Sequence, residues 1–456
     1  MQLRQQAKRY VLENVTRIPL PLGHVLMAVN RDPIRVYGRD YAAFRDRLRM
    51  TDKGYDNGPD VLRVVNTALA KVPYYRDRYG DRRVATLDEV RERIGFLDRS
   101  SVAEAAAQLV DPGLDPAQYD TCSTGGTSGP PLRLLAPKRR YVVEHATMHS
   151  LWERAGFAFH PRAVIRNHRV PDRRPYVINP ITREVIFDGF RLDGDSIAGV
   201  VEVIRRLGLR FIHCYPSHAY EIALRMLELG VPGTGVTFLS GSETVHTHQR
   251  ETIEQRLGAR FYNWYGHSEK LVLAGYCAST HDYHVEPLYG FFELIDERGQ
   301  VITRPGTIGE IVGTSLHNPG MPLIRYRTGD FAEYVGDHCA GCRRNVHVIR
   351  NVRGRWSGER IYRADGSFIT TTALNLHDEL NRVVDGLQYV QEARGELIVH
   401  VVKSRSFTHE HDTRLRRALG EKLGDGFRIE VRYVEQLARL PNGKFSHLIS
   451  RIPTHA

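Results

Sequence analysis

The stretch Arg260-Phe-Tyr-Asn-Trp-Tyr-Gly-His-Ser-Glu-Lys270 decides the fold class, because it is a buried strand that ends in polar residues. Two earlier stretches have the same plan, Phe211-Ile-His-Cys-Tyr-Pro-Ser-His218 and Val236-Thr-Phe-Leu-Ser-Gly-Ser-Glu-Thr244. Helical patterns at residues 219–229 and about 248–257 separate the three strands. This alternation predicts an open α/β sheet. Such sheets bind ligands at the carboxyl ends of their strands, so the three polar ends predict one shared crevice.

Upstream, the stretch Tyr119-Asp-Thr-Cys-Ser-Thr-Gly-Gly-Thr-Ser-Gly-Pro-Pro-Leu132 has the composition of an anion-binding loop. Its glycines can take positive φ and turn backbone N–H groups toward one point, and its hydroxyls add further donors. A flexible surface linker is the alternative. The proline pair and the leucines that follow favour an ordered loop before a strand. The stretch has neither the spacing of a Walker P-loop nor that of a dinucleotide fingerprint.

Composition describes an ordinary globular protein. A chain of 456 residues with 41% hydrophobic content can form two or three domains. The formal charge of +11 suits acidic substrates such as nucleotides. The sequence contains no run of basic residues with interleaved aromatics, so nucleic-acid binding is not expected. Five cysteines do not make a disulfide framework, which predicts a reducing compartment, with the cytoplasm as the default. Neither a signal peptide nor a membrane span is expected.

The serine in Gly266-His-Ser-Glu-Lys270 raises the alternative of a hydrolase nucleophile elbow. The elbow requires Gly-x-Ser-x-Gly, and the fifth residue here is Lys270. The second glycine that relieves crowding at the sharp turn is therefore absent. Glu269 is better interpreted as a magnesium ligand.

Beyond the alternating region the chain changes to β character, with period-two alternation at residues 290–296 and 309–315 that predicts a hairpin. The stretch Met321-Pro-Leu-Ile-Arg-Tyr-Arg-Thr-Gly-Asp330 follows. A strand here delivers two arginines and ends on an aspartate, which could bind phosphate and the vicinal hydroxyls of a ribose. An exposed Arg/Asp pair is the alternative.

Four stretches, in order, resemble motifs of the adenylate-forming enzymes that activate carboxylic acids with ATP. They are Ser123-Thr-Gly-Gly-Thr-Ser-Gly129, Tyr265-Gly-His-Ser-Glu269, Tyr326-Arg-Thr-Gly-Asp330 and Leu440-Pro-Asn-Gly-Lys444. Within that superfamily the chain most resembles the phenylacetate-CoA ligase family, particularly its branch linked to capsular polysaccharide biosynthesis. That finer likeness is carried by Val72-Pro-Tyr-Tyr75, Tyr215-Pro-Ser217 and Met321-Pro-Leu-Ile-Arg-Tyr326, and the resemblance covers most of the chain from about residue 60.

The resemblance implies an α/β fold in two parts. A large N-terminal AMP-binding domain with mixed sheets would span residues 1–353, and a small mobile α+β C-terminal domain carrying Lys444 would span residues 354–456. The hinge would lie near Arg355 to Gly358. Two departures stand out: Thr127-Ser-Gly-Pro-Pro131 lacks the usual lysine, and Trp356-Ser-Gly358 replaces the usual acidic hinge residues.

The resemblance also implies roles for individual residues. Lys444 would bridge the substrate carboxylate and the α-phosphate, and Glu269 would place Mg²⁺. The glycine-rich loop would hold the phosphates of ATP, residues 241–243 with 265 and 266 would lie along the adenine, and Asp330 with Arg355 would hold the ribose. The implied nucleotide-binding residues are Ser123, Thr124, Gly125, Gly126, Thr127, Ser128, Gly241, Ser242, Glu243, Tyr265, Gly266, Asp330 and Arg355.

The implied function is activation of a small carboxylic acid as an acyl-adenylate, followed by transfer to CoA. Alternative acceptors are a carrier-protein thiol or an amine. A non-catalytic binding or scaffold protein is an alternative of another class. A flat or apolar acid is suggested by His213, Cys214, Tyr215 and Trp264 as candidate pocket residues.

The cysteines suggest a separate metal site. Cys339 and Cys342 form a C-x-x-C pair, and Cys277 stands near two histidines, so the set fits a tetrahedral structural zinc site. The predicted ligands are Cys277, Cys339, Cys342 and one histidine, taken as His281, with His284 as the alternative. A redox or incidental C-x-x-C pair is the other interpretation. Some phenylacetate-CoA ligase relatives have a cysteine/histidine cluster in this region, which favours zinc.

Overall fold

The structure of the protein is a computed structural model. It describes residues 14–123, 132–171, 174–191, 194–354, 360–374, 380–438 and 448–452. Among these residues no helix is long and apolar enough to cross a bilayer.

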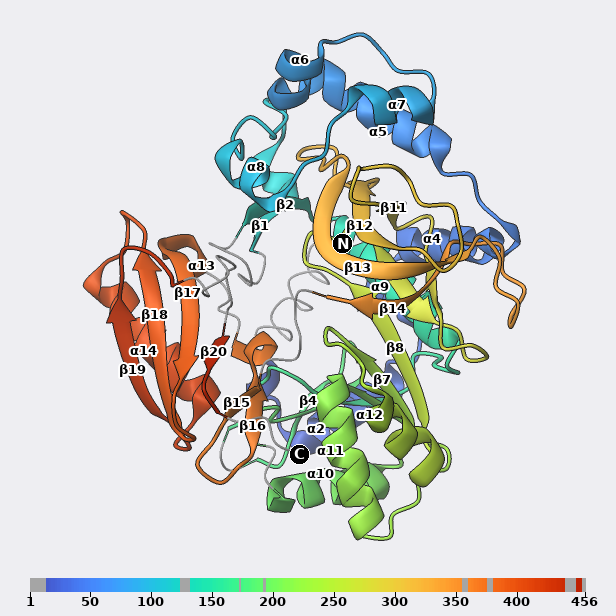
Figure 1. The fold of residues 1–456 in the computed structure, drawn as a ribbon. Coiled ribbons are helices and arrows are strands. Elements are labelled where there is room, and N and C mark those ends of the chain that lie inside the picture. Colours follow the sequence, from blue (N-terminus) through green and yellow to red (C-terminus); the bar gives the residue numbers. More distant parts are fainter. Residues whose placement is uncertain are drawn as a thin grey trace.

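Twelve of the described strands form one mixed sheet, in the order β11-β12-β13-β14-β10-β9-β8-β7-β6-β3-β5-β4 (Figure 1). The strands β5, β3, β6, β7 and β8 are parallel to one another, and the remaining neighbours are antiparallel. The predicted α/β fold with a mixed sheet is therefore confirmed. The strand bounds are β3 Arg162–Ile165, β4 Val177–Asn179, β5 Glu184–Phe187, β6 Phe211–Cys214, β7 Thr237–Gly241, β8 Arg260–Gly266, β9 Leu273–Tyr276, β10 Tyr283–Val285, β11 Gly290–Ile295, β12 Ile308–Ser315, β13 Tyr326–Gly336 and β14 Val348–Arg353.

The register of the parallel strands brings their carboxyl ends to one edge. Ile165 of β3 pairs with Cys214 of β6, Cys214 pairs with Ser240 of β7, and Ser240 pairs with Asn263 of β8. The residues that follow these positions therefore leave the sheet at a common level. This edge is the crevice that the polar strand ends predict.

Helices α9 (Arg140–Glu153), α10 (Gly194–Leu207), α11 (Pro216–Glu228) and α12 (Thr247–Glu251) pack on the parallel part of the sheet, and α12 continues as a π-helical turn, η4 (Thr252–Arg256). The buried positions of α10 recur at helical spacing and form one apolar face. Helix α11 begins at Pro216, where the missing proline N–H costs nothing. The strand predicted to stop at this proline ends two residues before it, at Cys214, and the helix predicted from residue 219 begins at Pro216.

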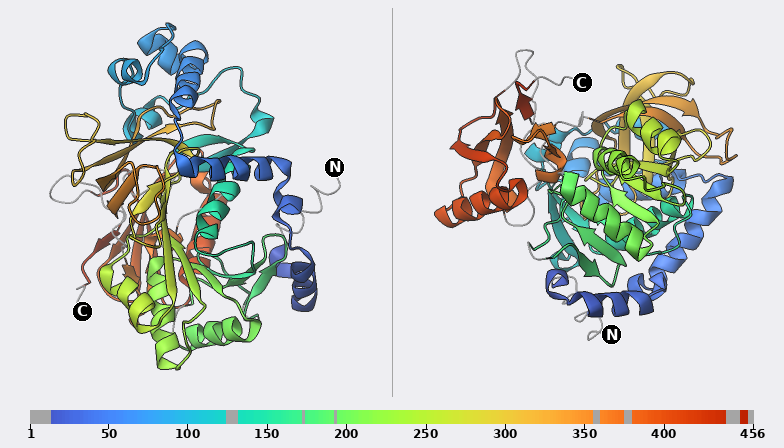
Figure 2. Two further views of the ribbon diagram at one scale, coloured as in Figure 1. Left: turned by 90° about the vertical axis from the view of Figure 1, so that its right-hand side faces the viewer. Right: turned by 90° about the horizontal axis from the view of Figure 1, so that it is seen from below.

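The N-terminal part is helical and wraps around one side of the sheet (Figure 2). A two-stranded hairpin follows it, in which Ser123 pairs with Arg133. The glycine-rich loop therefore connects the two strands of this hairpin. The bounds are η1 Val15–Arg17, α2 Leu20–Val29, α3 Pro33–Tyr37, α4 Arg39–Met50, η2 Thr51–Lys53, α5 Gly58–Lys71, α6 Pro73–Tyr79, α7 Leu87–Arg93, α8 Arg99–Glu104, η3 Pro116–Gln118, β1 Tyr119–Ser123 and β2 Arg133–Pro137.

The C-terminal part has a sheet and hydrophobic cluster of its own, seen in orange and red in Figure 1. Its four-stranded sheet has the order β19-β18-β17-β20, and α14 buries Leu415, Leu419 and Leu423 against it. Tyr215 and Phe190 of the larger part join this cluster, and Arg363 donates to the Phe190 carbonyl. The bounds are β15 Arg360–Tyr362, β16 Phe368–Thr370, η5 Thr371–Leu374, α13 Leu380–Val383, β17 Val384–Gln391, β18 Glu396–Lys403, α14 His409–Leu423, β19 Arg428–Tyr433 and β20 Leu448–Ser450.

Candidate functional site

A cavity of about 550 Å³ lies at the carboxyl ends of β3, β6, β7 and β8. Strand β13 and helix α9 supply further walls. Of the predicted nucleotide-binding residues, Ser242, Glu243, Tyr265, Gly266 and Asp330 line this cavity. Residues from three distant stretches of the sequence, 242–243, 265–266 and 330, thus border one space.

The phenol of Tyr265 anchors one side of the cavity. Its Oη donates to Oδ2 of Asp330 over 2.8 Å. Burial, and next the charge of Asp330, raise the pKa of Tyr265 well above its usual range. The phenol therefore keeps its proton, and the hydrogen bond orients the carboxylate of Asp330.

Gly241 ends β7 against an indole. A Cβ added to Gly241 would stand 2.5 Å from Cε2 of Trp264, so only glycine fits there without moving the ring. The next residue, Ser242, has a φ of 73°, which turns the chain out of the strand. Gly241 therefore leaves room for the Trp264 ring, which lines the cavity.

Glu269 also lines the cavity, and its carboxylate accepts two described hydrogen bonds. Tyr326 Oη donates to Oε1 over 3.0 Å, and His267 Nδ1 lies 3.1 Å from Oε2. His267 Nε2 accepts from the backbone N–H of Val272 at 3.2 Å, so its proton must reside on Nδ1 and point at the carboxylate. This carboxylate is 4% exposed and held by these oriented donors, so it can present oxygen to a hard cation such as Mg²⁺.

Several predicted residues lie outside the described part of the chain. These are Thr124, Gly125, Gly126, Thr127, Ser128, Arg355 and Lys444, together with the hinge at 355–358; of Ser123 only the backbone is described. The stem of the glycine-rich hairpin is described. Cys122 and Leu134 share a small cavity with Ser268 and Glu269, so the two ends of the loop emerge beside the candidate magnesium ligand.

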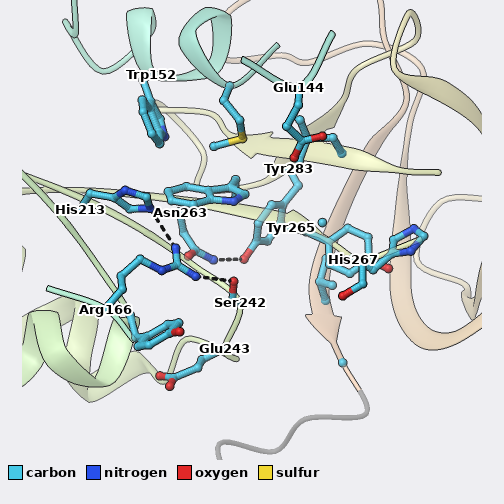
Figure 3. A pocket seen from close by; sticks show the side chains of 18 of the residues that line it. Glu144, Trp152, Arg166, His213, Ser242, Glu243, Asn263, Tyr265, His267 and Tyr283 are labelled. Atoms are coloured by element: carbon cyan, nitrogen blue, oxygen red, sulfur yellow. Dashed lines mark hydrogen bonds between the residues drawn. The ribbon is translucent and has the colours of Figure 1, made fainter. Parts of the chain in front are cut away.

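The far end of the cavity is aromatic. His213, Tyr215 and Trp264 line it, as expected, whereas Cys214 is completely buried behind the wall. Sequence analysis missed Trp152 of α9 and Arg166, which directly follows β3 (Figure 3). The position of Arg166 after a buried strand, like that of the other strand ends, is the signal that could have found it.

Four potential metal ligands gather away from the cavity. One ligand atom each from Cys277, His284, Cys339 and Cys342 lies within 4.8 Å of the others. His284 rather than His281 belongs to this group, and Nε2 of His281 instead lies 3.2 Å from Oε1 of Glu254. The reason is geometric: His284 lies in β10, which pairs with both β9 and β14, whereas His281 precedes that strand with a positive φ of 59°. Three sulfur ligands and one imidazole suit zinc.

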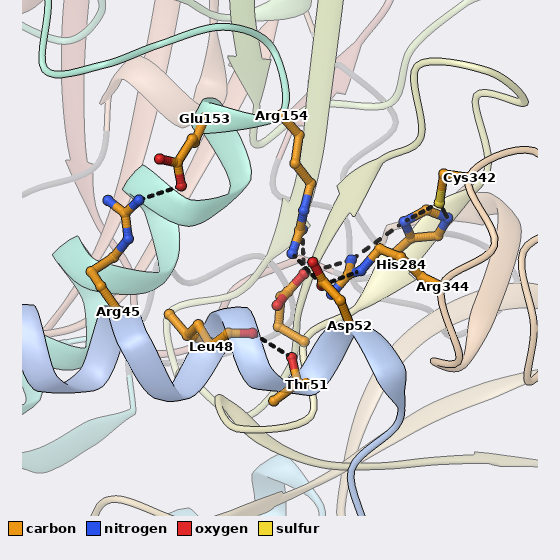
Figure 4. Close-up of polar contacts among 10 residues, drawn as sticks. Arg45, Leu48, Thr51, Asp52, Glu153, Arg154, His284, Cys342 and Arg344 are labelled. Atoms are coloured by element: carbon orange, nitrogen blue, oxygen red, sulfur yellow. Dashed lines mark hydrogen bonds and ion pairs between the residues drawn. The ribbon is translucent and has the colours of Figure 1, made fainter.

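Charged residues lie beside His284 and Cys342 of this group (Figure 4). Arg344 Nη1 lies 3.4 Å from His284 Nδ1 and 3.2 Å from Oε1 of Glu286. Arg154 reaches the same Glu286 oxygen. Burial, and then Arg344, lower the pKa of His284 to about 4, so the imidazole is neutral at neutral pH, as a metal ligand must be.

Comparison with solved structures identifies the class. A 2-hydroxyisobutyryl-CoA ligase in complex with 2-HIB-AMP and CoA has a TM-score of 0.56 at 16% identity, and the match covers 86% of this chain and 88% of that one. The same ligase in an open conformation has a TM-score of 0.52 at 16% identity, covering 86% and 90%. The chain thus shares the fold of this CoA ligase.

Sequence comparison is more specific. Residues 361–451 match the family model of the CapK C-terminal domain. A phenylacetate-coenzyme A ligase from Pseudomonas putida is 28% identical over 185 residues, 39% of this chain and 41% of that protein. Protein CapK from Staphylococcus aureus is 20% identical over 281 residues, 60% of each. The chain spans between about two fifths and three fifths of the length of these two relatives. The predicted likeness to phenylacetate-CoA ligases and to the CapK branch is confirmed.

Proposed function

We propose that this protein activates a small carboxylic acid with ATP, forming an acyl-adenylate, and passes the acyl group to CoA. The observation that carries this proposal is the cavity in which the oriented Asp330 and Glu269 face one space beside the stem of the glycine-rich hairpin. A sugar-binding carboxylate, a cation-binding carboxylate and a phosphate loop are the parts that bound ATP requires.

The described residues divide the work of adenylation. Asp330, fixed by the Tyr265 phenol, accepts from the ribose hydroxyls, while Ser242 and Glu243 border the base. Glu269, fixed by Tyr326 and His267, holds Mg²⁺, which when bound neutralises phosphate charge. In the step itself a carboxylate oxygen of the acid forms a bond to the α-phosphorus, and the bond to the bridging oxygen breaks, releasing pyrophosphate.

The residues outside the described part complete the proposal by resemblance. Thr124 to Ser128 would cradle the β- and γ-phosphates, Arg355 would assist at the ribose, and the ammonium of Lys444 would stabilise the charge that develops between carboxylate and α-phosphate. In the second step the CoA thiolate attacks the acyl carbon and AMP leaves.

CoA is proposed as the acceptor because the sequence relatives include phenylacetate-coenzyme A ligases and a solved structure with the same fold is a CoA ligase in complex with CoA. A carrier-protein thiol and an amine are the competing acceptors. Mass spectrometry of the acyl-adenylate after addition of CoA, a carrier protein or an amine separates them, because only the true acceptor consumes it.

We also propose that Cys277, His284, Cys339 and Cys342 hold one zinc ion. All four positions of a tetrahedral site would be filled by protein, so the ion would be structural rather than catalytic. It would tie the C-x-x-C turn to the β9–β10 region.

ATP–pyrophosphate exchange tests the proposed adenylation. The protein is assayed with a panel of aryl, aliphatic and amino acids, and Asp330→Asn is compared with Glu333→Gln, a control on the same strand. We expect exchange with at least one acid and its loss only in Asp330→Asn. Absence of exchange with every acid in a broad panel contradicts the proposal.

A further inference from the structure

Three aromatic rings form the far end of the cavity, away from Asp330 and Glu269. The ring centroids of Trp152 and His213 are 5.1 Å apart, those of Trp152 and Trp264 are 5.6 Å apart, and those of His213 and Trp264 are 5.4 Å apart. Figure 3 shows Trp152 hanging from α9 toward His213. Such a wall favours a flat ligand.

This wall also carries hydrogen-bond donors that no described residue accepts. Arg166 Nη1 lies 2.8 Å from His213 Nε2. Since a guanidinium can only donate, Nε2 accepts and the imidazole proton resides on Nδ1. That Nδ1 is buried without a partner among the described residues, and so is Nε1 of Trp152. Trp152 is 4% exposed.

Unsatisfied buried donors have a cost that a ligand can remove. A buried donor without an acceptor forgoes the hydrogen bond that water would give it. Both donors belong to rings that line this end of the cavity, so an acceptor-bearing ligand group placed against these rings would remove that cost.

The charge at this end favours an anion. Arg166 donates to Ser242 Oγ over 3.0 Å and stacks 4.4 Å above the Tyr215 ring, but no described carboxylate forms an ion pair with it. The other acidic groups of the cavity are engaged elsewhere: Glu184 pairs with Arg162, Glu144 with Lys270, and Glu243 accepts from the Ser217 N–H.

We propose that the acid activated in this cavity has a flat body and carries a second carboxylate at the end remote from the reacting one. Arg166 binds that second carboxylate, and the N–H groups of His213 and Trp152 provide further donors. The proposal rests on the proposed function for the identity of the reacting carboxylate. It narrows the substrate class to flat dicarboxylic acids, in which one carboxylate is activated and the other is recognised.

The test compares two probes of similar shape that differ in the second charge. Binding of 4-carboxyphenylacetate and of 4-methylphenylacetate is measured by isothermal titration calorimetry with AMP present. We expect the dicarboxylate to bind at least about tenfold more tightly, because hydrogen bonds to charged groups contribute about 1.5–3 kcal/mol.

Four variants locate the effect. Arg166→Gln should abolish the preference, and Arg166→Lys should keep part of it because it retains the charge but not the fork of donors. Arg205→Gln, an exposed arginine on α10, should leave it unchanged. Trp152→Phe keeps a ring but removes its N–H, and should reduce only the affinity for the dicarboxylate, by severalfold. Circular dichroism checks that each variant is folded.

The outcomes separate this proposal from the proposed function. The proposed second carboxylate would be overturned by equal affinities for the two probes or by no binding of either. It would also be overturned if Arg166→Gln weakened the binding of both probes equally, a result that would place Arg166 at the reacting carboxylate. A preference that Arg166→Gln erases supports it, even if pyrophosphate exchange fails. Exchange with 4-methylphenylacetate but not with 4-carboxyphenylacetate would leave the adenylation standing and overturn the dicarboxylate.

Discussion

The cavity and the cysteine/histidine cluster both bury polar side chains, but they arrange them in opposite ways. In the cluster the four ligand atoms face one another, and Arg154 and Arg344 form ion pairs with Glu286, although Glu286 Oε2 and Arg344 Nη2 have no described hydrogen-bond partner. In the cavity the donors of Trp152 and His213 face no described acceptor. A group of side chains that satisfies itself around one ion suits a permanent structural site, whereas unsatisfied groups suit a ligand that comes and goes.

The largest expected effect concerns the cluster. His284→Gln should reduce bound zinc from about one ion per chain to nearly none and lower the melting temperature, because structural zinc contributes on the order of 10 kcal/mol. Elemental analysis and thermal unfolding measure this. His281→Gln is the matched control and should keep its zinc. Loss of zinc in His281→Gln instead would contradict the ligand set.

The next effect concerns the cavity. Lys444→Ala should lower ATP–pyrophosphate exchange by about 10² to 10³-fold, because an ammonium at the developing charge is worth several kcal/mol in a preorganised site. Its melting temperature should stay at the wild-type value, in contrast to His284→Gln. If exchange persists at the wild-type rate, Lys444 does not take part in adenylation.

A third effect depends on pH. His218 is buried beneath the cavity wall, and its Nδ1 lies 3.1 Å from the Ile165 carbonyl. Burial lowers its pKa to about 4, opposed by that hydrogen bond and assisted by Arg166. Between pH 6.5 and 4 the unfolded chain therefore binds the extra proton, and stability falls on acidification by roughly 3 kcal/mol at this residue.

Urea unfolding at pH 7 and pH 4 measures that loss. His218→Asn keeps a donor near the Ile165 carbonyl but does not titrate, so its stability should fall less over this interval than that of the wild type. Equal losses in the two proteins would show that His218 does not contribute.

The smallest effect comes from the hydroxyl of Tyr265. Tyr265→Phe keeps the ring but removes one hydrogen bond from the Asp330 carboxylate, so ATP affinity should fall by about three- to tenfold, the value of one hydrogen bond to a charged group. Calorimetric titration with ATP measures it, and Tyr334→Phe is a control on β13. An unchanged affinity would mean that Asp330 needs no orientation.

The sequence was informative where function depends on backbone position. Strand ends identified Ser242, Glu243 and Tyr265 because parallel strands deliver their carboxyl ends to one edge. Asp330 was expected at the end of a strand but lies inside the antiparallel strand β13, so its motif and not its place in the sheet identified it. It was less informative where function depends on side-chain packing. His281 and His284 stand four and seven residues after Cys277, and either spacing fits a zinc site, so only the pairing of β10 with β9 and β14 distinguishes them. Trp152 lies on α9, a helix on which the sequence predicted no site residue.

Arg166 illustrates the same limit. Several arginines lie near it in the sequence, and nothing in the sequence distinguishes Arg166 from them. Only its contacts with His213 and Ser242 show that it lies at the cavity. Gly241 shows the converse, since a glycine before a polar loop suggested contact with the nucleotide, whereas its close approach is to the Trp264 ring.

Tyr215 belongs to two neighbourhoods at once. Its ring lines the cavity and lies under Arg166, and it is also packed into the hydrophobic cluster of the C-terminal part. The cavity and the C-terminal hydrophobic cluster therefore share the Tyr215 side chain. A ligand that displaced this ring would also disturb the packing of that cluster.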